Sequence, residues 1–336
     1  MRSGGKALNV FECKAFNMSG AKSPLRQYPV NQSPLYRLAS RLKVADLLGV
    51  SLKSLENLAR AQESYRVFDI AQNGKLRQVE VPKGLLSKVH KRLFLLLSRV
   101  EKPDYLHSGV RGRSYITNAK AHAPNVPLVK VDVKKFYPSV HRGMIFDFFR
   151  FQMQCSPDVS GLISALCSYQ NHLPTGSAVS QLMAYFAVKP MFDALNKLAN
   201  QSDLKMTCYV DDLTFSGEQA TPRFLWEAKK IIHRFGLKSH KEKWYAANDR
   251  KLVTGVLLVG RQAVVQPCKE HAMWQEICAL STLSDVERLS ALNRLIGRAN
   301  AAAQIESRFL QKFQRLTLQR KSTQVSVKSS MEQFLA

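Results

Sequence analysis

Residues 208–215 read CYVDDLTF and set two adjacent carboxylates, Asp211 and Asp212, at the tip of an expected β-hairpin. A third carboxylate, Asp132, comes near the end of the run LVKVDV at residues 128–133, whose valines favour a strand. Phosphoryl transfer from a nucleoside triphosphate uses two divalent cations about 3.5–4 Å apart, and magnesium prefers carboxylate, water and phosphate oxygens. The three aspartates therefore predict a site for two Mg²⁺ ions, for which Mn²⁺ can substitute. The alternative is an acidic turn with an unrelated capping aspartate.

The composition of the 336-residue chain predicts a surface that binds phosphates. Its formal net charge of +25 attracts nucleic-acid backbones and releases their counterions on binding. A ribosomal-type or membrane-surface protein would share that charge, but a hydrophobic content of 45% is enough for a core and argues against a basic tail protein. The sequence has no apolar stretch of membrane-spanning length and starts without a hydrophobic signal core, so we expect no membrane partner.

The six cysteines are scattered and form no Cys-x-x-Cys pair. A zinc site or a disulfide framework is therefore not expected, and reduced thiols are the default. The expected location is the cytoplasm.

Three segments follow from the distribution of polar, apolar and basic residues. Residues 1–64 are predicted to form a loose arm followed by helices, residues 65–265 to alternate strands with helices, and residues 266–336 to be basic and helical. Within the first segment, residues 34–62 have helix-turn-helix spacing. We interpret this spacing as a plain helical pair, because such pairs are common, rather than as a DNA-binding unit.

Turn signals and periodicity place the elements of the central segment. Gln72-Asn73-Gly74 predicts a hairpin over residues 65–82. A second hairpin is expected at residues 204–215, and two further strands at residues 251–266. The expected helices span residues 83–101, 142–170, 179–200 and 222–235.

Three sequence boxes occur in a fixed order: DVKKFYPS at residues 132–139, HLPTGSAVSQ at residues 172–181 and YVDD at residues 209–212. With these boxes and their spacing the chain resembles reverse transcriptases, over roughly residues 34–310. The resemblance implies an α+β fold of the right-hand polymerase type, with fingers, a palm built on an antiparallel sheet, and a helical thumb. Residues 1–64 would then extend the fingers, residues 65–265 would form fingers and palm, and residues 266–336 the thumb.

Two shorter elements narrow the resemblance to bacterial retron reverse transcriptases. NAKAH at residues 118–122 fits their Asn-Ala-x-x-His element, and VTG at residues 253–255 fits their Val-Thr-Gly triplet. The chain departs from the family where Thr175 replaces the usual Gln and where Ala178-Val179 replaces the common Pro-Thr or Pro-Ser. We expect these departures to tune contacts with the primer strand and the nucleotide without abolishing activity.

The resemblance implies roles for residues at the nucleotide site. Asp132, Asp211 and Asp212 would be the catalytic metal ligands, with the backbone of Val133 touching the triphosphate. Tyr137 would lie under the sugar and exclude a 2′-hydroxyl, although an aromatic at this position could also be a packing residue.

Further residues are implied in holding the triphosphate and the primer. Lys75 and Arg77, after the Asn-Gly turn, would grip the triphosphate; the alternative is a pair of solvated hairpin charges. Gly176 and Gln181 would position primer and nucleotide. Lys243 would act as an acid for the leaving pyrophosphate, with Lys241 competing for the same place.

RNA contact is implied at two places. The first consists of the two short elements, in which Asn118 and His122 could read RNA or simply staple a loop, and the Val-Thr-Gly triplet could be a tight turn. The second is the basic C-terminal segment, where compensating acids are few. The implied RNA-binding residues are Asn118, His122, Val253, Thr254, Gly255, Arg294 and Arg298.

As a whole, the resemblance implies synthesis of DNA from dNTPs on a dedicated noncoding RNA that is both primer and template. Synthesis would start at the 2′-hydroxyl of a guanosine and give branched RNA–DNA, known as msDNA. The implied partners are a defence effector protein, within antiphage defence, and a host RNase H acting on the hybrid. The alternatives are an intron-type or diversity-generating reverse transcriptase, an RNA polymerase, or a catalytically idle RNA-binding protein of the same fold.

Overall fold

The computed structural model describes residues 27–72, 74–122 and 125–335, without the side chains of residues 62, 72, 75 and 328–335. Residues 1–26 of the predicted arm, which ends at residue 33, and Asn73 of the predicted turn therefore lie outside the described residues. Helices and antiparallel sheets together make up the fold, as the sequence predicted for the α+β class.

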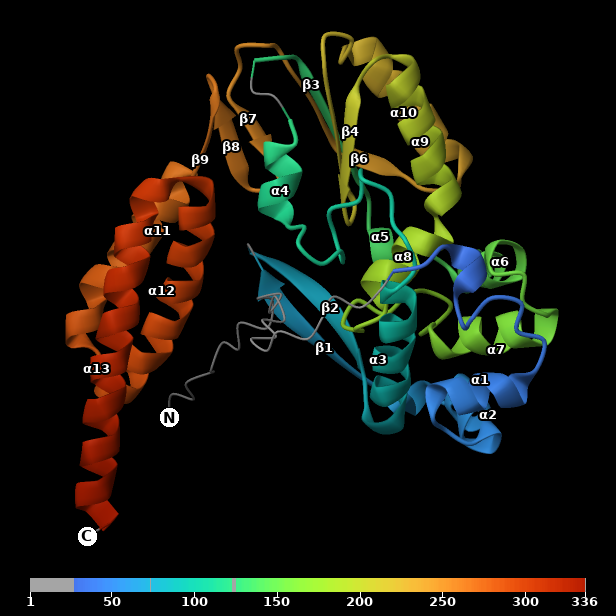
Figure 1. Cartoon of the computed structure of the whole chain (residues 1–336), viewed down its shortest axis with the longest axis horizontal. Helices are drawn as coiled ribbons and strands as arrows, with labels where there is room; N and C mark the ends of the chain where they lie inside the picture. The colour runs from blue at the N-terminus through green and yellow to red at the C-terminus, as the bar shows by residue number, and fades with distance from the viewer. Residues whose placement is uncertain (1–26, 73, 123–124, 336) are drawn as a thin grey trace.

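A four-stranded antiparallel sheet stands at the centre, in the order β4-β5-β3-β6. Its strands are β3 (Leu128–Val133), β4 (Lys205–Tyr209), β5 (Asp212–Ser216) and β6 (Ser239–Tyr245). Helices α9 (Lys189–Gln201) and α10 (Pro222–Arg234) lie against it (Figure 1). Alternating side chains of the strands face these helices, and Leu213 and Phe215 of β5 are fully buried, which fixes the register of the strand.

A long hairpin and a group of helices continue the same core. The hairpin pairs β1 (Tyr65–Gln72) with β2 (Lys75–Pro82). The helices are α1 (Arg41–Leu48), α2 (Leu52–Arg60), α3 (Gly84–Ser98), α5 (Phe136–Ser139), α6 (Arg142–Asp147), a π-helical turn (Phe148–Gln152), α7 (Pro157–Leu166) and α8 (Ser180–Ala187). Leu35 and Leu55 belong to one buried cluster with Val133 of the central sheet, so this core is continuous across residue 64.

A small second sheet extends the molecule on the side away from α9 and α10 (Figure 1). It consists of β7 (Lys251–Val253), β8 (Val256–Val259) and β9 (Gln262–Val264), and α4 (Tyr115–Lys120) packs on it. Ile116 of α4, Leu128 of β3 and Val256 of β8 share a separate buried cluster. This cluster joins the two sheets.

Three helices end the chain beyond the small sheet (Figure 1): α11 (Pro267–Cys278), α12 (Asp285–Ile305) and α13 (Leu310–Leu335). They enclose a core of their own, with Met273, Leu292, Leu295 and Phe309 buried. In the described residues, each helix is either too short or too polar to reach across a lipid bilayer.

Candidate active site

The three aspartates meet at one end of the central sheet. The register of β3 and β5 places Asp132 opposite Asp212. Asp211 occupies the two-residue turn between β4 and β5, and its carbonyl oxygen accepts a hydrogen bond from the Val133 N–H at 2.9 Å. Each strand therefore brings one carboxylate to the same place, and the turn adds the third.

The turn itself has a strained backbone. Val210 has φ 61°, in the left-handed region that a β-branched residue rarely adopts. Its N–H donates to the buried Ser108 Oγ at 2.9 Å. Next to it, the N–H of Cys208 donates to the Tyr105 carbonyl at 2.7 Å, and the N–H of His107 donates to the Cys208 carbonyl at 2.8 Å. The segment at residues 105–108 thus holds the turn in its strained shape.

The carboxylates carry more negative charge than their surroundings offset. Burial, followed by the neighbouring charge of Asp132, raises the pKa of Asp211 to about 6. Burial also raises the pKa of Asp212, against the lowering effect of Lys130. The Oδ1 atom of Asp212 is buried and has no hydrogen-bond partner. Buried like charges with an unpartnered oxygen are a donor set that suits a hard divalent cation.

Two lysines and a histidine lie against two of the aspartates in the present arrangement. Lys241 Nζ lies 2.9 Å from Asp132 Oδ2, and His240 Nδ1 lies 3.2 Å from Asp132 Oδ1. Lys130 Nζ lies 2.8 Å from Asp212 Oδ2. As these side chains stand, no three His, Cys, Asp or Glu residues in the described part of the chain form a group that could hold a metal ion.

Sequence reasoning missed Lys130, although its signal is simple. Lys130 precedes Asp132 by two residues on β3, so both side chains project from the same face of the sheet. His240 and Ser108 were missed as well, and neither stands in a recognisable motif.

A β-bulge decides between the two candidate lysines. The register of β3 and β6 shifts between Lys130 and Asp132, and Lys241 takes φ 53° there. The bulge turns Lys241 onto Asp132, whereas Lys243 is exposed opposite Lys130. The structure therefore places Lys241, rather than the predicted Lys243, at the carboxylates.

Tyr137 lies on the short helix α5, which follows β3 after a left-handed Lys135 at φ 49°. It is half-buried, and its ring centroid lies 5.9 Å from that of the buried Phe136. Tyr137 therefore lies on the helix that directly follows the strand carrying Asp132.

The hairpin and the Gly176 loop lie in contact. Lys75 begins β2, and Arg77 is exposed two residues later. The N–H of Gly176 donates to the Glu80 carbonyl of β2 at 3.0 Å. Gln181, the second residue of α8, is half-buried, and its Cδ lies 3.5 Å from where a Cβ on Gly109 would stand.

The two short elements bind each other inside the protein. Asn118 is fully buried, and its Nδ2 donates to Thr254 Oγ1 at 3.3 Å. The Thr254 hydroxyl in turn donates to the Tyr115 carbonyl at 2.7 Å. His122 is 2% exposed, and its two ring nitrogens lie 2.7 Å from the hydroxyls of Ser216 and Thr207.

These contacts favour the loop staple over RNA reading for Asn118 and His122, because both side chains are buried and have internal partners. Burial lowers the pKa of His122 to about 3, so the ring is neutral and serves as the loop staple left open above. Val253 is buried too, and Gly255 (φ 85°) forms the tight turn between β7 and β8. The Gly255 carbonyl accepts from Lys269 Nζ at 2.9 Å, which ties this turn to α11.

Arg294 and Arg298 lie on one face of α12 and share a single acid. Arg294 Nη2 lies 3.0 Å from Glu276 Oε1 of α11, and Arg298 pairs with the other oxygen of Glu276. Both guanidinium groups are partly exposed, and two positive charges face one negative charge. The pair therefore keeps a net positive charge at the surface.

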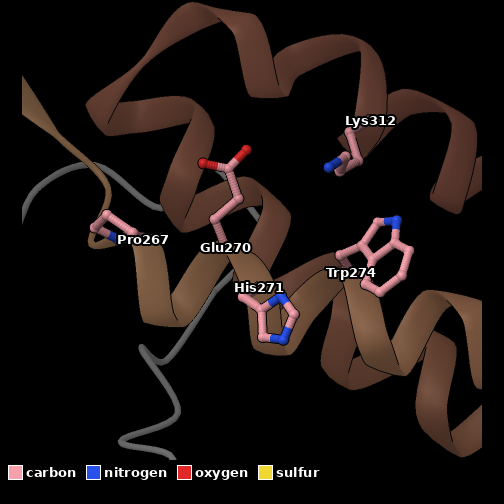
Figure 2. A pocket seen from close by; sticks show the side chains of 5 residues that line it. All are labelled: Pro267, Glu270, His271, Trp274 and Lys312. Carbon is pink, nitrogen blue, oxygen red and sulfur yellow. The ribbon is translucent and has the colours of Figure 1, made fainter.

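A separate hollow of about 510 Å³ lies between α11 and α13 (Figure 2). Trp274 is 56% exposed, and its ring is nearly parallel to that of His271 at a centroid distance of 5.9 Å. Lys312 comes from the facing helix, and Glu270 is bound by Arg308 through two hydrogen bonds of 2.8 and 2.7 Å. The carboxylate of Glu270 is therefore already paired with a cation.

The chain is similar to several curated bacterial proteins. It is 29% identical to the Retron Se72 reverse transcriptase of Salmonella heidelberg over 190 residues, which are 54% of this chain and 49% of that protein. Over 309 residues it is 23% identical to the Retron Ec48 reverse transcriptase of Escherichia coli, covering 83% of this chain and 75% of the relative. Over 274 residues it is 26% identical to the Retron Mx162 reverse transcriptase of Myxococcus xanthus, covering 70% and 56%.

No protein-family model matches the chain. The matches span about half the length of the first and third of these relatives and three quarters of the second. All three named relatives are retron reverse transcriptases, and they come from three different bacteria. By sequence, this chain is similar to bacterial retron reverse transcriptases.

Proposed function

We propose that the chain is an RNA-directed DNA polymerase of a bacterial retron, which copies a dedicated noncoding RNA into single-stranded DNA from dNTPs. The observation that carries this proposal is the convergence of Asp132, Asp211 and Asp212 at one end of an antiparallel sheet, in a chain similar to retron reverse transcriptases. An unpartnered buried carboxylate oxygen and the net charge of +25 support the same conclusion.

The parts of a right-hand polymerase are assigned within this proposal. The central sheet with α9 and α10 is the palm, the β1–β2 hairpin with the helices around it forms the fingers, and α11 to α13 form the thumb. The separate core of α11 to α13 supports a thumb beginning near residue 266. Arg294 and Arg298 would give this thumb a positive surface for the RNA backbone, held in place by Glu276.

In this proposal each residue has a task set by its place. Two Mg²⁺ ions, held by Asp132, Asp211 and Asp212, would supply the charge that clamps the attacking and leaving oxygens. The strained turn fixes Asp211 and Asp212 relative to Val133, whose N–H is bound to the Asp211 carbonyl. Lys241 is the lysine nearest to Asp132 and would stabilise the leaving pyrophosphate. Lys75 and Arg77 of the hairpin would grip the triphosphate.

Tyr137→Ala is expected to raise the ratio of ribonucleotide to deoxynucleotide incorporation, because a smaller side chain at α5 leaves room for a 2′-hydroxyl. Tyr137→Phe is the matched control, since it keeps the ring and should keep the ratio of the wild type. The measurement is single-nucleotide extension of an annealed primer with each sugar in turn. An unchanged ratio in a folded, active Tyr137→Ala protein would assign Tyr137 to packing alone.

Priming distinguishes a retron enzyme from other reverse transcriptases of the same fold. With the noncoding RNA encoded beside its gene, with dNTPs and no added primer, the protein is expected to make DNA joined to the 2′-hydroxyl of a guanosine in that RNA. A debranching enzyme should release this DNA. If every DNA product starts from an ordinary 3′-hydroxyl end, the retron assignment is wrong and the polymerase assignment stands.

The same proposal includes two protein partners and a location. A retron enzyme in the cytoplasm would rely on a host RNase H to remove RNA from the hybrid, and it would act with a defence effector protein against phage. The likeness to retron enzymes supports this part of the proposal. Loss of phage resistance on deleting the gene would test it in cells.

A further inference from the structure

A buried carboxylate ties the loop at residues 172–177 to the strand β2. Glu80 of β2 is 3% exposed. Its Oε1 lies 3.0 Å from His172 Nε2, and its Oε2 accepts the N–H of Thr175 at 3.2 Å. The hydrogen bond to Glu80 is the main cause that raises the pKa of His172. One acid of the hairpin therefore holds two residues of the loop.

The hydroxyl of Thr175 forms hydrogen bonds with backbone groups on the free edge of β2. It donates to the Gln78 carbonyl at 3.1 Å and accepts the Glu80 N–H at 3.3 Å. Because β2 pairs with β1 alone among the described strands, these backbone groups have no partner strand on this side there. The Gly176 N–H adds a third bond, to the Glu80 carbonyl at 3.0 Å. The loop thus takes the place of a neighbouring strand.

The helix α3 holds the loop from a second direction. His90 is fully buried, with Nε2 2.7 Å from the Leu166 carbonyl and Nδ1 2.6 Å from Ser177 Oγ. Since a carbonyl only accepts, Nε2 carries the hydrogen, and Nδ1 accepts from the Ser177 hydroxyl. Burial lowers the pKa of His90 to about 4, so the ring stays neutral. The loop is therefore fixed between the hairpin and α3.

We propose that Glu80, His172 and Thr175 form a clasp that positions the loop at residues 172–177 against the β1–β2 hairpin. In the proposed polymerase, the loop would position the primer and the hairpin would grip the triphosphate. This inference rests on the proposed polymerase function. Arg77 lies one residue from the Gln78 carbonyl, and Gly176 follows Thr175 directly, so the clasp joins both halves of the nucleotide site. Its three members are positioning residues, because they act through their neighbours. Thr175, which departs from the family's usual Gln, supplies the hydroxyl on which the clasp depends.

The test is Thr175→Val, which keeps the shape of the side chain and removes both hydroxyl bonds. Loss of these bonds is expected to raise KM for dNTPs about tenfold, with a smaller change in kcat. Thr175→Ser keeps a hydroxyl and should restore KM. Thr221→Val is the matched control: Thr221 caps α10 by accepting the Phe224 N–H at 3.2 Å. It should lower Tm and leave KM unchanged.

Hydrogen exchange gives a readout that does not depend on catalysis. The amides of Glu80 and Gly176 should exchange faster in Thr175→Val, and not in Thr221→Val, because only the first change opens the clasp. If wild-type protein makes no DNA, the proposed function fails while the exchange measurement still decides whether the clasp exists. Unchanged exchange, or an equal rise of KM in both valine variants, would overturn the clasp. Glu80→Gln replaces Thr175→Val, with the same expected outcomes, if the valine variant does not fold.

Discussion

Asp211→Asn combined with Asp212→Asn is expected to abolish DNA synthesis and leave the fold intact. Amide side chains cannot hold two divalent cations, whose contribution to the transition state is several kcal/mol, so the rate should fall by at least about a thousandfold. The measurement is magnesium-dependent incorporation of labelled dNTPs on an annealed primer. Asp147→Asn with Asp203→Asn makes the same change of charge at two exposed positions and should keep the wild-type rate.

The thermal stability of Asp211→Asn alone provides a second check. A carboxyl whose pKa is raised from 3.8 to about 6 in the folded protein is destabilising when it is charged, so stability falls as the pH rises between these values and stays lower above them. Asp211→Asn removes this charge and is expected to leave Tm unchanged or higher at pH 7 in the presence of a chelator. A large loss of Tm, or synthesis at the wild-type rate, would contradict the assignment of the aspartates.

Gly176→Ala is expected to reduce synthesis strongly because the loop can approach β2 only without a side chain. An added Cβ would lie 2.7 Å from Val81 Cγ2 and 2.9 Å from the Glu80 carbonyl oxygen. Backbone atoms cannot yield as a flexible side chain does, so the loop must move away from the hairpin. We expect a loss of about 10- to 100-fold in kcat/KM, since small displacements of positioning groups have effects of this size.

Gly161→Ala on α7 is the control for Gly176→Ala, because a Cβ there would meet nothing within 4 Å. Alanine is the better helix former, so this variant should be at least as stable as the wild type and equally active. Extension of an annealed primer compares the two variants, and circular dichroism shows whether each is folded. Wild-type kinetics in Gly176→Ala would mean that the close approach of loop and strand has no part in synthesis.

Local patterns predicted the elements that form the candidate site. The alternation before the aspartate pair predicted the β4–β5 hairpin, and the run at residues 128–133 predicted β3, because buried strands are marked by β-branched and apolar residues. The strand β6 was not predicted. Its sequence SHKEKWY is polar and lies at the edge of the sheet, where periodicity gives little signal. The expected helix at residues 142–170 is interrupted by a π-helical turn and a bend.

Contacts between distant residues could not be predicted from the sequence. Asn118 and Thr254 are 136 residues apart, and only the fold shows that their side chains are hydrogen-bonded to each other. The position of Lys241 at Asp132 depends on a β-bulge, which no residue pattern announces. No sequence pattern singles out Glu80, because its burial and its bond to Thr175 depend on the distant loop at residues 172–177.

The left-handed backbone of Val210 lowers the stability of the fold but restricts the aspartate turn to one conformation. A β-branched residue at φ 61° costs about 1–3 kcal/mol, which glycine would not. Glycine would also free the turn to sample other shapes, since it loses the steric restriction that a valine side chain imposes. Selection for heat tolerance alone would therefore drive position 210 toward glycine, and selection for synthesis would drive it back. In a library selected for thermostability alone, we expect Val210→Gly to be the first change that reduces DNA synthesis.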